Sequence, residues 1–419
     1  MEPIRKPRGT IDVLPGETSA WQYVESVIRG VCRNYGFGEI RFPTFEQTEL
    51  FDRGVGDTTD VVQKEMYTFT DRDGRSLSLR PEGTACVARS VIENGLCAGA
   101  MPLKLYYITN FFRYEKPQAG RTREFFQFGT ELFGSALPSA DAEAIALAHR
   151  VFSALGLTSV RLHINSVGCR DCRPRFREAL IGYFEKNIDS LCPTCRDRLY
   201  RNPLRILDCK SPVCSGIAAG APRTTDYLCD TCRGHAEGVE RLLGSAGIEY
   251  TVDPHIVRGL DYYTRTVFEF IDDRIGAQST VCGGGRYDGL VSSIGGPEIP
   301  GVGFGMGLTR LLACLERDGL LPGEDGSPEL YIAPLGDDSA AAAFALGEKL
   351  RSAGINVTSD LCGRSVKAQM KYADKISAKR VIVIGGDELA AGRAVMKSMT
   401  GGESKEVALT AEDIAANLK

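Results

Sequence analysis

The hydrophobic pattern of the chain changes near residue 320, and this change limits the folds open to it. Before that point, strand patterns come in runs with helical patterns around them, without regular alternation. Such an arrangement predicts an α+β domain with a largely antiparallel sheet. The expected helices are 20–35, 141–155 and 307–315, and the expected strands are 40–43, 77–80, 104–108, 125–133 and 267–271.

A different pattern follows a Pro- and Gly-containing linker at residues 321–328. Beyond the linker, strand and helical patterns alternate regularly, which predicts a small α/β domain with parallel strands. The expected strands are 330–333, 355–357 and 381–384, and the expected helices are 340–353 and 366–376.

Cysteine is concentrated between residues 169 and 232, where eight of the 14 cysteines lie. In a chain without a secretion signal, close cysteine pairs predict metal sites or reduced thiols before disulfides. Two pairs look like zinc knuckles and together would form one tetrahedral Cys₄ site for a structural Zn²⁺. Eight thiols also allow two ions, so the ligand pairing stays open, and buried reduced thiols are the alternative. The two knuckles are Cys192/Cys195 and Cys229/Cys232, and the other close pairs are Cys169/Cys172 and Cys209/Cys214.

These patterns divide the chain into three parts. Residues 1–168 and 246–325 form the core domain, and the Cys- and Arg-rich segment 169–245 is inserted into it. Residues 328–419 form the C-terminal α/β domain.

Charge and hydropathy exclude some functions and leave others open. No apolar run approaches the roughly 20 residues of a membrane helix, and residues 1–7 lack the apolar core of a secretion signal. We therefore expect a cytoplasmic protein without a membrane-bound part. The net charge of −4 does not exclude a nucleic-acid partner, because a local basic face is enough. Lys367, Lys371 and Lys375 share one helix face, which fits such a partner or a solvated surface.

Two segments carry residues suited to phosphate binding. In residues 112–125, a strand delivers Arg113, a Pro/Gly turn follows, and Arg121 and Arg123 precede a returning aromatic strand. Guanidinium groups bind phosphate oxygens through two parallel donors, although a solvated hairpin has the same pattern. In residues 301–311, alternate glycines permit a close approach to the strand backbone, and the strand runs into a helix carrying Arg310.

In order and separation, these two segments resemble motifs 2 and 3 of class II aminoacyl-tRNA synthetases. Arg41-Phe42-Pro43 with the preceding helix is similar to motif 1, which forms the homodimer interface in that class. Residues 257–266, 283–290, 80–84 and 7–12 resemble segments of histidyl-tRNA synthetases. The resemblance covers the whole chain. It implies a six-stranded antiparallel catalytic sheet, a homodimer, and a C-terminal domain that binds the anticodon.

The resemblance implies that ATP with Mg²⁺ activates L-histidine. Arg113 and Arg258 would be the catalytic residues, holding the α-phosphate from opposite sides while Arg113 also holds the histidine carboxylate. Arg121 and Arg310 would bind the outer phosphates, and Phe125 with Arg310 would enclose the adenine.

The resemblance also implies a polar pocket for histidine and contacts to tRNA(His). Glu82, Thr84 and Gln127 would accept hydrogen bonds from the ammonium group, while Glu131 and Tyr263 would bind the imidazole. The full expected histidine-binding set is Glu82, Gly83, Thr84, Arg113, Gln127, Glu131, Arg258, Tyr262, Tyr263 and Tyr287. The expected tRNA-binding residues are Lys116, Gln118 and Arg123.

Two related activities compete with this interpretation. A regulatory paralogue of the family partners with the first enzyme of histidine biosynthesis, but it typically lacks the C-terminal domain and the full histidine motifs. Prolyl, threonyl and glycyl synthetases share the C-terminal domain. The segment Arg258-Gly259-Leu260-Asp261-Tyr262-Tyr263 argues against both.

Overall fold

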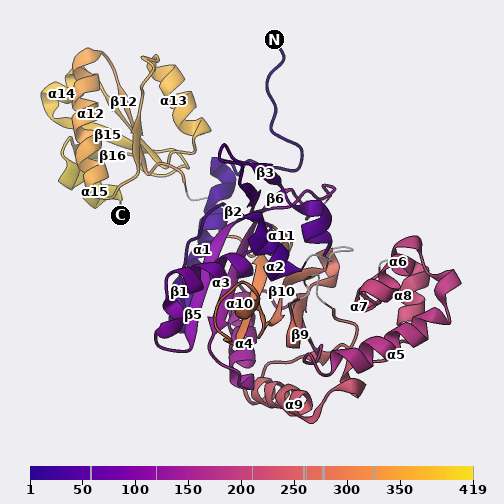
Figure 1. The fold of residues 1–419 in the computed structure, drawn as a ribbon. Coiled ribbons are helices and arrows are strands. Elements are labelled where there is room, and N and C mark those ends of the chain that lie inside the picture. The colour runs from indigo at the N-terminus through magenta and orange to yellow at the C-terminus, as the bar shows by residue number, and fades with distance from the viewer. Residues whose placement is uncertain are drawn as a thin grey trace. The chain divides into compact units, whose positions relative to one another are not determined.

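The structure is a computed structural model that describes residues 1–56, 59–118, 120–209, 211–257, 260, 262–275, 279–323 and 326–418. It contains two compact units, Met1–Pro322 and Gly323–Lys419, shown in Figure 1. Among the described residues, no helix combines the length and apolar character needed to cross a bilayer.

The first unit is built on an eight-stranded mixed sheet with the order β1-β5-β6-β11-β10-β9-β7-β8. Its six central strands pair antiparallel throughout, as expected, and a two-residue strand adds in parallel at each edge. The strands are β1 (Gly38–Glu39), β5 (Leu103–Phe112), β6 (Glu124–Phe133), β7 (Arg161–Ser166), β8 (Thr251–Val252), β9 (Thr264–Ile271), β10 (Thr280–Arg286) and β11 (Gly301–Gly307).

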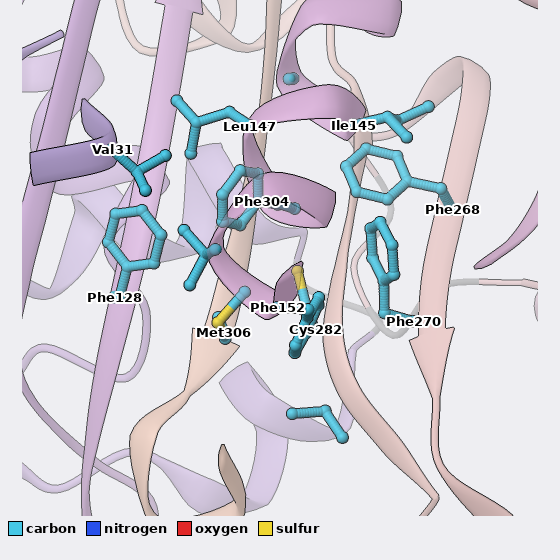
Figure 2. Packing of buried hydrophobic residues seen from close by; sticks show 14 of the residues in the cluster. Val31, Phe128, Ile145, Leu147, Phe152, Phe268, Phe270, Cys282, Phe304 and Met306 are labelled. Atoms are coloured by element: carbon cyan, nitrogen blue, oxygen red, sulfur yellow. The ribbon is translucent and has the colours of Figure 1, made fainter. Parts of the chain in front are cut away.

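One face of this sheet packs against helices through an aromatic core. The alternating apolar residues of β6, β9 and β11 point to this face, because side chains alternate along a strand. Figure 2 shows Phe128 and Phe304 beside Val31 and Leu147, and the two rings meet edge to face at 5.4 Å. The covering helices are α1 (Pro15–Asn34), α4 (Pro138–Ala154), α9 (Asp230–Ser245) and α11 (Leu308–Arg317).

The opposite face carries shorter elements. A small sheet with the order β2-β4-β3 precedes α3, whose first turn enters the candidate site. These elements are β2 (Phe45–Gln47), α2 (Thr48–Val55), the π-helix η1 (Val61–Glu65), β3 (Thr68–Thr70), β4 (Ser76–Leu79), α3 (Thr84–Glu93) and α10 (Leu290–Ser293), with short 3₁₀ turns η2 (Leu96–Ala98) and η5 (Asp273–Ile275).

The strand expected at 40–43 is wrong, because pairing stops at Glu39 apart from one hydrogen bond from the Ile40 N–H to Tyr106. The carbonyls of Phe42 and Pro43 instead accept hydrogen bonds from the buried Arg80 guanidinium, at 2.9 and 3.1 Å. A proline cannot donate to a strand ladder, so the segment is held by a side chain.

The Cys-rich segment contains helices and no described strand, in agreement with its weak strand signal. Figure 1 shows α5 to α8 gathered together. Val239 and Leu243 of α9 belong to the sheet core, so the last helix within the expected insertion bounds packs with the core domain. The insertion helices are α5 (Arg173–Glu185), η3 (Ile188–Ser190), α6 (Pro193–Arg201), α7 (Leu204–Leu207), α8 (Pro212–Ala218) and η4 (Thr224–Tyr227).

The second unit has a five-stranded sheet with the order β13-β12-β14-β15-β16. The three expected strands pair in parallel, while β15 and β16 add antiparallel and were not predicted. Its elements are β12 (Leu330–Pro334), α12 (Asp337–Ser352), β13 (Val357–Ser359), α13 (Val366–Lys375), β14 (Arg380–Ile384), α14 (Gly386–Ala391), β15 (Arg393–Ser398), β16 (Lys405–Ala408) and α15 (Ala411–Leu418).

Candidate active site

A cavity of about 730 Å³ lies over the eight-stranded sheet. Its wall includes Arg113 after β5, Phe125 and Gln127 on β6, and Arg310 in the first turn of α11. Arg121, from the hairpin between β5 and β6, also lines the cavity. Three of these five side chains are arginines, whose guanidinium groups suit phosphate oxygens. The wall of the cavity also carries six carboxylates, Asp60, Glu65, Glu115, Asp208, Asp253 and Glu269.

The three arginines are held by backbone and side-chain acceptors. Arg113 Nε donates to the Pro81 carbonyl at 2.8 Å, and its guanidinium lies 5.4 Å from the Phe125 ring centre. Arg310 donates to the carbonyls of Thr280 and Gly120, at 2.6 and 3.2 Å. Burial lowers the pKa of Arg310, and the positive charges of Arg121 and Arg113 lower it further. Like charges gathered in this way favour an anionic ligand that separates them.

A second polar group lies on the same face of β6. Glu131 is fully buried, and its carboxylate accepts hydrogen bonds from Thr84 Oγ1 at 2.9 Å and from the Tyr287 hydroxyl. The Tyr107 hydroxyl is 3.4 Å away. Burial raises the pKa of Glu131 to about 8. A carboxyl group in this state is ready to exchange a proton near neutral pH.

Glu82 is the second buried acid of this group. Its carboxylate accepts the backbone N–H groups of Thr84 and Ala85, both at 2.8 Å, in the first turn of α3. Burial raises the pKa of Glu82, while these two N–H groups act in the opposite direction. The helix N-terminus therefore orients an acceptor close to Glu131, with Thr84 bridging the two acids.

Three tyrosine rings enclose this group. The Tyr262 ring centre lies 4.8 Å from that of Tyr263 and 5.6 Å from that of Tyr287. Glycines make room for them: a Cβ on Gly285 would lie 2.9 Å from the Tyr263 ring, and one on Gly303 would lie 3.0 Å from the Tyr287 hydroxyl. The close approach expected of the glycine-rich strands thus occurs between the strands and the pocket side chains.

The structure brings together the described members of both expected sets. The histidine set surrounds Glu131, and the ATP set lines the cavity, with Gln127 and Arg113 between them. Arg258, Gly259 and Asp261 lie outside the described residues, so the expected convergence of Arg113 and Arg258 stays a prediction.

The expected tRNA-contacting residues lie on the outer part of the hairpin. Lys116 and Gln118 are exposed, and the Arg123 guanidinium lies 3.9 Å from the centre of the Tyr114 ring. Lys116 and Arg123 line a second hollow of about 240 Å³ together with Arg8. Three cationic side chains therefore meet at one surface beside the cavity.

Several residues of the site could not be identified from the sequence. Tyr107 contacts Glu131 and fills the space left by Gly83 and Gly129, but its only sequence signal was strand alternation. Glu115 pairs with Arg121 at 2.9 Å inside the cavity. From the insertion, Arg198 and Arg205 also line the cavity, and Arg198 binds Asp60 at 2.7 Å. Nothing local in the sequence connects these distant segments.

The cysteines of the insertion form two groups of four thiols, within which all sulfur atoms lie within 4.8 Å of one another. The neck cluster is Cys169, Cys172, Cys229 and Cys232, and the insertion cluster is Cys192, Cys195, Cys209 and Cys214. The two knuckles therefore belong to different clusters, and the expectation that they share one Cys₄ site is wrong. Cys229 and Cys232 lie beside Cys169 and Cys172, and Cys192 and Cys195 lie beside Cys209 and Cys214.

The central antiparallel sheet, the arginine hairpin between β5 and β6, and the glycine strand leading to Arg310 form the catalytic fold of a class II aminoacyl-tRNA synthetase. A family model described as histidyl-tRNA synthetase matches residues 9–171 and 220–311, and one described as an anticodon binding domain matches residues 329–418.

Individual proteins agree with these family models. Histidine–tRNA ligase of Acetivibrio thermocellus is 52% identical over 403 residues, covering 96% of this chain and 97% of that protein. Histidine–tRNA ligase of Desulforudis audaxviator is 54% identical over 409 residues, covering 97% of this chain and 96% of that protein. The crystal structure of apo S. aureus histidyl-tRNA synthetase has a TM-score of 0.82 and 39% identity, covering 99% of this chain and 98% of that one. The chain belongs to the histidyl-tRNA synthetase family.

Proposed function

We propose that this chain uses ATP to activate L-histidine as histidyl-adenylate and transfers the histidyl group to the 3′ end of tRNA(His). One observation supports this most directly. Along one face of β6, Phe125 and Gln127 line the cavity that holds the arginines, Gly129 leaves room for a tyrosine ring, and Glu131 is the buried acid. At about 3.4 Å per residue, one strand spans the distance from a nucleotide to an amino-acid side chain.

In the first step, a carboxylate oxygen of histidine attacks the α-phosphorus, and the bond to pyrophosphate breaks. Negative charge develops on the phosphate oxygens, so positioning and cationic stabilisation carry the catalysis. Arg113 would hold the carboxylate and the α-phosphate, with Arg258 on the opposite side. Arg121 and Arg310 would bind the outer phosphates, and Phe125 offers its ring to the adenine.

Mg²⁺ neutralises part of the triphosphate charge when it is bound. Glu115 and Glu65 are cavity-lining carboxylates suited to hold it, because hard cations prefer oxygen ligands. Burial raises the pKa of Glu65, and the neighbouring Glu115 raises it further. A nearby cation would stabilise both acids in their charged form.

The pocket around Glu131 would bind the amino acid. Glu82, Thr84 and Gln127 offer acceptors to the ammonium group, while Glu131 and Tyr263 face the two imidazole nitrogens, with Tyr262 and Tyr287 enclosing the ring. A pocket that hydrogen-bonds its substrate rejects analogues lacking those groups by about 10⁴–10⁵-fold. Selection for histidine then needs no separate editing site.

The tRNA would contact both units. Lys116, Gln118 and Arg123 present a polar, cationic surface beside the cavity, where the acceptor end must enter. Residues 328–419 would bind the anticodon, with Lys367, Lys371 and Lys375 exposed on α13. Salt would weaken such contacts strongly, because phosphate binding releases counterions.

A homodimer in the cytoplasm is part of the same proposal. The segment Arg41-Phe42-Pro43 and helix α1 would form the interface. Phe45 and Phe69 are 51% and 43% exposed and stack edge to face at 6.2 Å on the neighbouring small sheet. A second copy of the chain would cover this apolar pair. Any ion in the Cys-rich insertion would be structural and would take no part in the bond-making and bond-breaking of activation.

The decisive experiment is ATP–pyrophosphate exchange with each of the twenty amino acids. We expect exchange with histidine alone. Arg258→Ala should slow exchange strongly with a modest loss of histidine affinity, whereas the exposed Arg53→Ala variant should match the unmodified chain. Exchange driven by proline, threonine or glycine would refute the choice of substrate, and no exchange with any amino acid would refute the activity.

A further inference from the structure

The eight cysteines of the insertion are arranged for metal binding at two separate positions. Every one of them is a free thiol. We propose that the neck cluster and the insertion cluster each bind one Zn²⁺ through four thiolates, and that the neck ion also holds the backbone of Tyr263 at the histidine pocket. The second part of this proposal rests on the proposed function.

Sulfur separations fit a single tetrahedral ion in each cluster. Zinc–sulfur bonds of about 2.3 Å place the sulfurs of a tetrahedron about 3.8 Å apart. In the neck cluster, Cys169 Sγ lies 3.7 Å from Cys172 Sγ and 4.0 Å from Cys229 Sγ. In the insertion cluster, Cys192 Sγ lies 3.9 Å from Cys209 Sγ. An iron–sulfur cluster would need more room between its four thiolates, and all separations here are below 4.8 Å.

Backbone donors around the sulfurs support charged thiolates. The N–H of Cys229 donates to Cys172 Sγ, and the N–H of Cys192 donates to Cys214 Sγ, both at 3.2 Å. Each bond runs from the first residue of a knuckle to a sulfur of the other pair in its cluster. Hydrogen bonds of this kind orient metal ligands and stabilise their charge.

The two clusters stabilise different parts of the chain. The neck cluster joins the segment that leaves β7 to the segment that enters α9, where the insertion departs from and returns to the core domain. The insertion cluster lies among the apolar residues that pack α5, α6 and α8 together. Helices this short bury little apolar surface, and small domains of this kind often depend on a metal.

The neck cluster is joined by hydrogen bonds to the chain around Tyr263, whereas the insertion cluster packs with Val257 and its segment reaches the cavity wall through Arg198 and Arg205. The N–H of Val167 donates to the Arg265 carbonyl at 2.7 Å, and the N–H of Arg265 donates to the Gly168 carbonyl at 2.8 Å. The guanidinium of Arg173 donates to the Tyr263 carbonyl. Residues 167–173, which carry Cys169 and Cys172, are thus bonded to the chain on both sides of Thr264. Loss of the neck ion should therefore displace Tyr263, while loss of the other ion should not.

Metal analysis of the freshly purified, reduced full-length chain tests the ligand sets. We expect two zinc ions per chain, one in Cys169→Ser and one in Cys209→Ser. Cys362→Ser, which changes an exposed cysteine in the second unit, should keep two. Cys169→His should restore the second ion, because imidazole replaces thiolate at zinc, and this variant guards against simple misfolding. No zinc, iron in its place, disulfides in its place, or loss of both ions from one substitution would refute the two-site assignment.

Exchange kinetics test the link to the pocket. Cys169→Ser should raise the KM for histidine roughly tenfold with little change in the KM for ATP, and Cys169→His should reverse the effect. Cys209→Ser should raise the KM for histidine much less than Cys169→Ser does, because its cluster packs at Val257 and not at Tyr263. Equal effects from both Ser variants would refute the positioning role. A zinc-free chain that still activates histidine would refute only this inference, whereas a chain with two zinc ions that activates no amino acid would refute only the proposed function.

Discussion

The affinity for histidine should depend on pH in a way set by Glu131. Burial raises the pKa of this carboxyl to about 8, whereas the imidazole of free histidine titrates near 6.5. Between these values the free pocket holds one proton on Glu131 and the free imidazole is neutral. A complex in which the carboxyl and the ring share one proton then forms with no net proton exchange.

Outside this window, binding must move a proton. Below about pH 6.5 the free imidazole carries an additional proton that must be released, and above about pH 8 the ionised Glu131 pocket must take one up. Each pH unit beyond either limit should weaken binding about tenfold, or about 1.4 kcal/mol. We therefore expect the tightest binding between pH 6.5 and 8, with about tenfold weaker binding at pH 5.5 and pH 9.

Calorimetric titration of histidine into the chain across this range would measure the effect. Glu131→Gln cannot take up the proton, so its affinity should not fall through pH 8 as that of the unmodified chain does. The α-amino group of histidine titrates identically with both proteins, and the difference therefore isolates Glu131. At pH 7 the variant should bind about 1.5–3 kcal/mol more weakly, because a hydrogen bond to a charged group is lost.

The matched control is Glu143→Gln, which removes a partly exposed carboxylate on α4 that pairs with Lys104 of β5. Its pH profile should match that of the unmodified chain. A decline in affinity above pH 8 that persists in Glu131→Gln would refute the assignment, as would net proton release on binding at pH 7 in buffers of different ionisation enthalpy.

Two further predictions concern stability. Gly303→Ala should destabilise the first unit, because its Cβ would overlap the Thr130 carbonyl and the Glu131 carboxylate, whereas Gly305→Ala meets Gln127 at an ordinary 3.5 Å and should be tolerated; equal urea midpoints would contradict this. Asp141→Asn should lower the free energy of unfolding by about 3–5 kcal/mol, because Asp141 and Arg286 form an ion pair with no exposed side-chain surface. Asp288→Asn changes a 29% exposed partner of Arg286 and should lower the free energy of unfolding much less. Since Arg286 and His235 lower the pKa of Asp141 despite its burial, this contribution should be lost as pH falls.

Local sequence patterns predicted the parts of the fold that depend on near neighbours. The alternation from Phe125 to Phe133 became β6, and the glycine alternation at 301–307 became β11. In β6 the alternating aromatic residues indicate which side chains are buried, and in β11 the alternating glycines indicate where another group approaches the backbone closely. The expected Arg113, Arg121 and Arg310 meet in one cavity because these strands are neighbours in the sheet.

Features that depend on distant segments could not be predicted in this way. The spacing Cys-x-x-Cys identifies a pair but not the second pair that joins it, which depends on how α5 to α9 fold back. Likewise, Arg80 holds the segment at Phe42 and Pro43 from across the small sheet, and this contact replaced an expected strand. In the sequence, Tyr107 has only the pattern of a strand residue. Its place beside Glu131 depends on Gly83 and Gly129, which come from other segments and leave room for its ring.

The placement of Glu131 suggests why this pocket would select an imidazole. A buried carboxyl with a pKa of about 8 is held by hydroxyl donors from Thr84 and Tyr287 and has no described cationic partner of its own. Asparagine and glutamine side chains can donate a hydrogen bond to Glu131 but cannot accept its proton, so they cannot form an ion pair with its carboxylate. Histidine is the side chain whose unperturbed proton exchange lies near neutral pH, and its ring can take that proton while remaining bonded through its second nitrogen. Selectivity would then come from the shared proton as much as from shape. A neutral isostere of histidine that keeps the ring but cannot be protonated should bind poorly to the unmodified chain and lose little further affinity to Glu131→Gln.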